Sequence, residues 1–322
     1  GNYPLSAAKA AAHTLGLHEA VNKAAGAFFW QLPGACATYV LGLALLHMPP
    51  AHDITSLQFR ILLGAGALPA LVVLVAATLE PDDGAAKSRG NGELRQALAT
   101  SHHWRTLVGT AGSWFLFDVA FYGTVIFMPI ILKQIWGEDS SLEAIAWRAL
   151  SVCVFGMAAT SGGVLTLRRG WLSPRSLNTV GLVAAGVLFA VFAVVYRTAP
   201  DCSYVLFALL CSLLGALYFG PNLATYVLPV VCFPEDVRAT FHGLSAAAAK
   251  IGAMVGALLF PVMDHYLGVT AVMATEAAVC LAAAALTHFA LDDRGPPEDK
   301  ERDIELVDRA EASENSESSL LG

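Results

Sequence analysis

The chain has 322 residues, 56% of them hydrophobic and 14% charged, and its formal net charge is −7 at pH 7. A soluble domain usually carries about 25% charged residues, so the composition excludes an ordinary soluble domain and indicates an integral membrane protein. The net negative charge does not come from the apolar part of the chain, because residues 292–322 hold eleven acidic and four basic side chains and account for all of it. We expect residues 291–322 to form a disordered, solvated tail.

Eight apolar stretches follow a short stub at residues 1–8, and each is long enough to cross a bilayer, which takes about 20 helical residues. Small residues, Gly and Pro are frequent inside them, as in packed transmembrane helices. The sequence therefore predicts an all-α, polytopic transmembrane helical bundle. The expected spans are 24–47, 57–79, 106–132, 147–167, 176–196, 204–230, 239–263 and 268–290.

The segments between these spans predict the orientation and the domains. Those on the side of residues 9–23 carry ten basic residues and those on the other side carry four, which places residues 9–23 and the C-terminus in the cytoplasm. Many transporters consist of two helical halves joined by a cytoplasmic linker. We interpret 80–104 as such a linker, 1–79 as the remainder of an N-terminal bundle and 105–290 as a C-terminal bundle of six helices.

One acidic residue, Asp118, is the only charged residue between positions 106 and 132. A charge at that depth costs roughly 2.5–3.5 kcal/mol on insertion scales, which makes it a candidate functional group. Trp114 and Tyr122 lie four positions to either side and share its helical face. This face presents an indole donor, a carboxylate and a phenol together. The alternative is a fixed ion pair that joins two helices.

One basic residue, Lys250, is likewise the only Asp, Glu, Lys or Arg between positions 239 and 263. Its ammonium must face an aqueous space, a carboxylate or a substrate, and Asp118 is the natural partner. A lysine that extends toward an interface is the alternative, but a position near the middle of a span disfavours it. Glu276, in the last span, has no obvious partner. We expect it to make an interhelical contact or to lie near the outer surface.

Several classes of function are excluded by missing patterns. The six cysteines lack metal-ligand or disulfide spacing, so we expect no metal or cofactor. The sequence contains no GxSxG, HExxH or P-loop motif, so we expect no enzyme. Basic residues are spread thinly along one side, which argues against nucleic-acid binding.

Four blocks of sequence carry a resemblance to a known family. Residues 1–7, GNYPLSA, are similar to its GGDYPLSA signature, and residues 59–70 resemble its WRxxLGxGAxPA. Residues 114–123, WFLFDVAFYG, nearly repeat its WFLLDVAFYG. Residues 219–229 and 233–253 resemble its tenth and eleventh helices. On these blocks the chain resembles the phosphate:proton symporters of the major facilitator superfamily, and the resemblance implies that it begins in the fourth helix and lacks roughly the first three.

The resemblance implies a function and a set of site residues. It implies a secondary active transporter that imports inorganic phosphate with protons by alternating access. The transporter would span the lipid bilayer of the plasma membrane and act as a monomer. Asp118 would exchange the coupling proton, because burial and a bound anion both favour the neutral form of a carboxyl group. The positions implicated in binding phosphate are Tyr3, Gln31, Trp114, Asp118, Tyr122, Asn222 and Lys250.

Two alternatives stay open. The first keeps the fold and carries a sugar or an organic anion. The second is a phosphate-binding sensor or a truncated product that does not transport. The family has Asp where this chain has Asn2, and an amide cannot exchange a proton near neutral pH, so any proton step at that position is lost.

Overall fold

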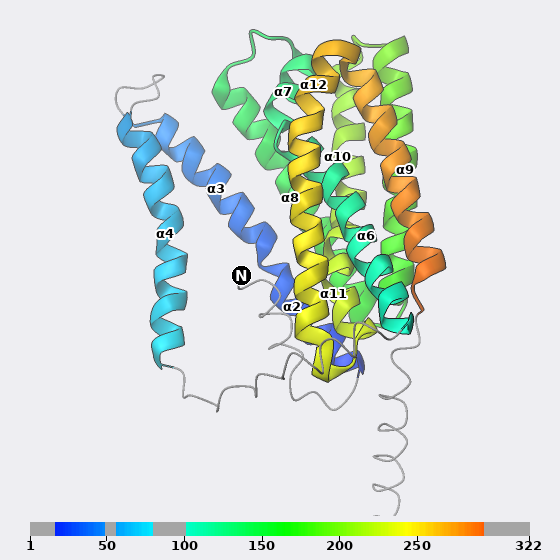
Figure 1. Cartoon of the computed structure of the whole chain (residues 1–322). Coiled ribbons are helices and arrows are strands. Elements are labelled where there is room, and N and C mark those ends of the chain that lie inside the picture. The colour runs from blue at the N-terminus through cyan, green and yellow to red at the C-terminus, as the bar shows by residue number, and fades with distance from the viewer. Residues whose placement is uncertain (1–16, 49–55, 80–100, 293–322) are drawn as a thin grey trace, which may run out of the picture.

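The computed structural model describes residues 17–48, 56–79 and 101–292, and all regular structure in these ranges is α-helical. This confirms the predicted all-α fold. Helices α6 to α12 form a bundle, α2 and α3 lean against it, and α4 stands beside α3 (Figure 1). Asn2, Tyr3, most of the expected linker and nearly all of the tail lie outside the described residues.

Three of the expected spans are single helices. They are α4 (Ser56–Leu79), α8 (Leu142–Arg168) and α9 (Pro174–Thr198). Within the described ranges, six helical stretches are long and apolar enough to cross a membrane, and a bent pair makes a seventh. Two of the six, His18–Leu46 and Ser203–Cys232, each contain a break between two helices. The longest of them, α12 (Glu235–Ala290), counts once in that number although it contains two of the expected spans.

The remaining spans are interrupted. Helix α2 (Leu17–Phe29) gives way to α3 (Gln31–Leu46) at Trp30, and α6 (Ser101–Val125) bends by 50° into α7 (Met128–Trp136). Helix α12 reverses at Gly268, whose φ of 77° lies in the region that favours glycine. Its two arms run in opposite directions (Figure 1). The separate spans expected at 239–263 and 268–290 are thus the two arms of α12.

The break between α10 (Ser203–Phe219) and α11 (Pro221–Cys232) lies at Gly220. Proline has no backbone N–H and is accepted in the first turn of a helix, so Pro221 starts a new helix rather than continuing the old one. A side chain on Gly220 would collide with the Leu177 carbonyl of α9. The break therefore fits closely against α9, and it places Asn222 in the first turn of α11.

A line of glycines brings α6 close to the first arm of α12. A Cβ atom on Gly252 would overlap the Phe115 carbonyl, and one on Gly256 would overlap the Val119 carbonyl. Small residues allow two helix backbones to approach within a membrane. This contact sets the register between the two helices.

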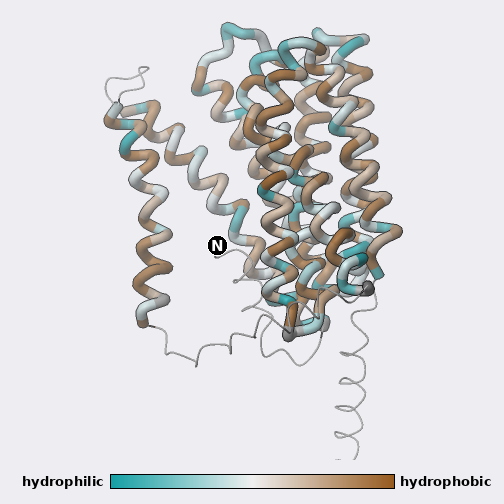
Figure 2. Tube along the Cα trace, viewed as in Figure 1, coloured by the Kyte–Doolittle hydropathy of each residue, from teal (hydrophilic) through white to brown (hydrophobic). Residues whose placement is uncertain are grey.

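Three polar side chains in the interior are paired across helices. Asn178 of α9 donates to Ser113 of α6 at 3.0 Å and to Thr287 of α12 at 2.9 Å. Apolar residues cover most of the length of the helices, and polar residues gather toward their ends (Figure 2). At one end Arg105 donates to the Phe289 carbonyl at 2.7 Å, which satisfies a free acceptor of the last helical turn.

Candidate functional site

The two solitary charges lie side by side. Lys250 Nζ, from the first arm of α12, is 3.4 Å from Asp118 Oδ2 of α6. The Asp118 side chain is 3% exposed, whereas that of Lys250 is 59% exposed. A charge-assisted hydrogen bond is usually about 2.7–2.9 Å long, so this pair is loose. The acid is enclosed, and the ammonium faces open space.

Tyr122 shares the ammonium with Asp118. Its hydroxyl oxygen accepts from Lys250 Nζ at 3.4 Å, and the same nitrogen lies 4.9 Å from the centroid of its ring. An aromatic ring attracts a cation over its face. The phenol thus contacts the ammonium from a second side.

Trp114 completes the row on α6. It is buried, and its side chain hydrogen-bonds to Asp118. Its ring meets His242 edge-on with centroids 5.7 Å apart, and His242 meets Tyr226 in the same way at 5.4 Å. Because His242 Nε2 lies 3.0 Å from the Tyr226 carbonyl, that nitrogen is the one that donates. His242 therefore packs against the Trp114 ring and helps to fix its position, a role that the sequence did not suggest.

Two amides join the first part of the chain to the bundle. Asn222 Nδ2 donates to Gln31 Oε1 at 3.2 Å. Gln31 begins α3 directly after the break at Trp30, and Asn222 follows the break at Gly220. Each amide thus stands at an interruption, where a side chain can project from the first turn of a helix.

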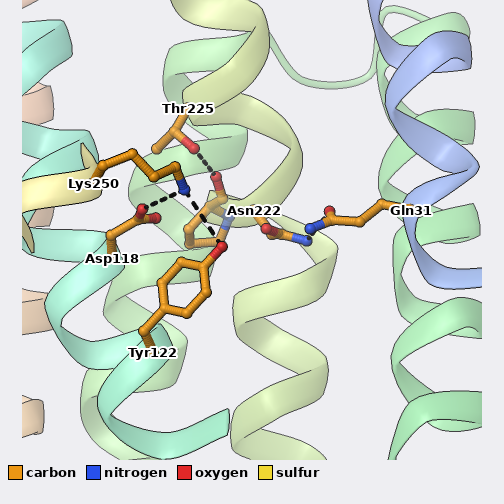
Figure 3. A network of polar contacts seen from close by, with 7 residues as sticks. Gln31, Asp118, Tyr122, Asn222, Thr225 and Lys250 are labelled. Atoms are coloured by element: carbon orange, nitrogen blue, oxygen red, sulfur yellow. Dashed lines mark hydrogen bonds and ion pairs between the residues drawn. The ribbon is translucent and has the colours of Figure 1, made fainter. Parts of the chain in front are cut away.

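These groups converge from four helices (Figure 3). Lys250 reaches toward α11 between Asp118 and Tyr122, and Gln31 reaches Asn222 from the opposite side. The set offers an exposed ammonium, amide and phenol donors, and one enclosed carboxylate. Such a combination suits a small oxyanion, whose oxygens accept several hydrogen bonds. Tyr3 lies outside the described residues.

Glu276, on the second arm of α12, does not join this cluster. Its side chain is 5% exposed, and Oε2 has no hydrogen-bond partner among the described residues. A Cβ atom on Gly123 would lie 2.7 Å from Oε1. Of the two expected positions, the structure therefore favours an interhelical one over one near the outer surface.

Comparison with known proteins points to one superfamily. Residues 85–310 match the profile of the family described as sugar (and other) transporter. The chain is 31% identical over 295 residues to inorganic phosphate transporter PT2 of Toxoplasma gondii, covering 91% of this chain and 52% of that protein. The chain thus spans about half the length of this relative.

Other curated relatives match a shorter region. Inorganic phosphate transporter PHO84 of Saccharomyces cerevisiae is 30% identical over 168 residues, which are 50% of this chain and 28% of that protein. Low affinity inorganic phosphate transporter 4 of Lotus japonicus is 34% identical over 167 residues, 49% of this chain and 31% of that protein.

Proposed function

We propose that this chain, which belongs to the sugar (and other) transporter family of the major facilitator superfamily, carries inorganic phosphate across a membrane together with protons. The observation that carries the proposal is the unequal pair of Lys250 and Asp118. The ammonium is open to an arriving anion, while the acid that neutralises it is enclosed. The names of the curated relatives support phosphate as the substrate.

Phosphate competes with Asp118 for Lys250 in this proposal. When the site is empty, the ammonium stabilises the ionised carboxylate at 3.4 Å. An oxyanion that binds Lys250 replaces Asp118 as its partner and adds a second negative charge nearby. Both effects favour protonation of Asp118, which can then donate a hydrogen bond to phosphate. Occupancy by phosphate and occupancy by a proton are therefore coupled.

Alternating access follows from the placement of the ligands on two parts of the chain. Gln31 belongs to α3, and Asp118, Tyr122, Asn222 and Lys250 belong to α6, α11 and α12. A ligand that bridges both parts stabilises their closure around it, and the two bundles of such transporters rock about a central site. We propose import across the plasma membrane, with the C-terminus in the cytoplasm and one chain as the unit.

The domain boundaries belong to the same proposal. Residues 1–79 form the end of an N-terminal bundle, 80–104 a cytoplasmic linker, 105–290 the six-helix C-terminal bundle and 291–322 a cytoplasmic tail. The contacts of α2 and α3 with α8 and α11 support this division, because two bundles that meet at these helices would make such contacts. Tyr3 would add a phenol from the N-terminal bundle.

A carrier of sugars or organic anions is the competing function, because the family description includes sugars. The exposed ammonium of Lys250 favours phosphate over a neutral sugar, since a sugar does not require a cation. The test is uptake of radiolabelled phosphate by the complete gene product in liposomes with an alkaline interior. We expect arsenate to compete and glucose to have no effect. Suppression by glucose would favour the sugar carrier, and phosphate binding without flux would favour a sensor.

A further inference from the structure

The second buried acid of the bundle, Glu276, has no assigned role in the site described above. It is 5% exposed, and its Oε2 atom is enclosed without a hydrogen-bond partner among the described residues. An ionised carboxylate left unpaired in a low-dielectric interior is strongly disfavoured, so the group must be neutral while it is enclosed. A structural contact alone would not require an acid here.

The space that Glu276 occupies is provided by α6. Gly123 directly follows Tyr122, and a Cβ atom at this position would lie 2.7 Å from Glu276 Oε1. Any larger residue would displace the carboxyl group. Glycine therefore allows the acid to lie against the same helix that carries Asp118 and Tyr122.

The position along the helix axis places Glu276 between the site and one membrane face. Glu276 lies eight residues after the reversal at Gly268, and Lys250 lies eighteen residues before Gly268 on the other arm. At 1.5 Å per residue these separations correspond to about 12 Å and about 27 Å. Glu276 is thus nearer than Lys250 to the face at which α12 turns, which is opposite the ends of α4 and α6 that flank residues 80–100.

No described group neutralises Glu276. Among the described residues, no Lys, Arg or His side chain forms a salt bridge with Glu276, so no such cation stabilises its ionised form. The nearest titratable side chain along α12 is Cys280, one turn further along the helix. Helices α6, α9 and α12 carry the other titratable side chains of this part of the bundle. Those of α6 and α9 are His102, His103, Arg105, Asp118, Tyr122, Arg175, Tyr196 and Arg197. Those of α12 are Glu235, Asp236, Arg238, His242, Lys250, Asp264, His265, Tyr266, Cys280 and His288.

We propose that Glu276 is a second proton-binding site, which takes up a proton from the face at which α12 turns and releases it toward the opposite face. This inference rests on the proposed function. The carboxylate gains one proton from water when the outer path is open, stays neutral while enclosed, and returns that proton to water when the inner path opens. Its protonation follows the conformational cycle because it has no cation to stabilise its charge. Each phosphate is therefore accompanied by one proton more than Asp118 alone would carry.

The first test measures the coupling ratio in liposomes that contain the complete gene product, with Glu276→Gln and Glu276→Asp compared. The phosphate gradient that just balances an imposed pH gradient gives the number of protons per phosphate. Removing one proton lowers the limiting accumulation about tenfold for each pH unit of gradient, because one pH unit is 1.36 kcal/mol per proton. We expect this loss for Glu276→Gln and not for Glu276→Asp. An unchanged ratio in Glu276→Gln would overturn the proposal.

The second test needs no transport. Infrared difference spectra of the purified protein between acidic and alkaline buffer report carboxyl groups that change protonation. We expect a carboxyl band that is present in Asp118→Asn and absent from Asp118→Asn with Glu276→Gln. The other acidic side chains titrate in both variants, so the band of Glu276 is found by subtracting one spectrum from the other. If the two spectra do not differ, Glu276 does not change its protonation and the proposal fails.

Exchange of external for internal phosphate distinguishes a failure of the second proton site from a failure of phosphate transport. Exchange in the unsubstituted protein together with an unchanged ratio in Glu276→Gln would reject the second proton site alone. Absence of any exchange in the unsubstituted protein would reject phosphate transport itself, and with it the coupling role of Glu276.

Discussion

Lys250 Nζ lies 3.4 Å from Asp118 Oδ2, and the two side chains differ widely in exposure, 59% for the lysine and 3% for the acid. This asymmetry decides which group an anion can reach. A buried pair with both partners enclosed would be a structural link, whereas an open ammonium above an enclosed carboxylate can change its partner.

Replacing Lys250 with Met tests the ammonium as the phosphate ligand. The substitution keeps an unbranched chain of similar length and removes the charge. We expect the affinity for phosphate to fall at least tenfold, about 1.4 kcal/mol, because truncating one partner of a charged pair is costly. Lys250→Arg is the charge-retaining control. Equilibrium binding of radiolabelled phosphate measures the effect, and an unchanged affinity in Lys250→Met would show that phosphate binds elsewhere.

Replacing Tyr122 with Phe removes one acceptor of Lys250 and keeps the ring beneath it at 4.9 Å. A single hydrogen bond contributes about 0.5–1.5 kcal/mol, so we expect the KM for phosphate to rise about two- to tenfold with uptake retained. The control is Tyr266→Phe, since Tyr266 is 76% exposed. Complete loss of uptake in Tyr122→Phe would contradict the expectation that the hydroxyl contributes only one hydrogen bond.

The glycine contact between α6 and α12 provides a matched pair of variants. A Cβ atom on Gly252 would overlap the Phe115 carbonyl, but one on Gly243 meets nothing within 4 Å. Overpacking of this kind costs typically about 1–3 kcal/mol, so Gly252→Ala should lower the thermal stability in detergent and weaken phosphate binding. Alanine is the better helix former by about 0.5–1 kcal/mol, so Gly243→Ala should be neutral or stabilising. Equal stability of the two variants would contradict the close approach of these helices.

Two free thiols lie on the two bundles that are expected to move relative to each other. Cys36 of α3 and Cys153 of α8 are free cysteines on two helices that contact each other. Oxidation with a membrane-permeant copper complex should join them and stop phosphate uptake, because the two bundles could no longer rock. Reduction should restore uptake, and Cys36→Ser should be insensitive. Transport that continues at full rate with the disulfide formed would argue against rocking at this boundary.

The sequence predicted the helices well because a charge-free apolar run has few alternatives in a membrane protein. It also predicted that Asp118 and Lys250 would meet, since two solitary opposite charges in apolar spans stabilise each other. The sequence predicted 204–230 as one span, whereas the structure interrupts it at Gly220, directly before Pro221. The site roles of these residues stay predictions, and their geometry is what the structure adds.

Other relationships depend on distances that a sequence does not contain. The contact of Gln31 with Asn222 joins positions 191 residues apart, and it requires the breaks at Trp30 and Gly220 to face each other. The packing of His242 on Trp114 depends on how far α12 extends past α6. Glu276 looks the same in the sequence whether it points inward or toward lipid.

The most direct test of the central claim is Asp118→Asn in the complete gene product reconstituted in liposomes. An amide keeps the shape and cannot bind a proton, so phosphate exchange should persist, while accumulation driven by a pH gradient should fall by the contribution of the proton that Asp118 carries. In the unsubstituted protein, accumulation should increase as the external pH falls, because protonation of Asp118 accompanies phosphate binding. Accumulation in Asp118→Asn with unchanged pH dependence would contradict the account.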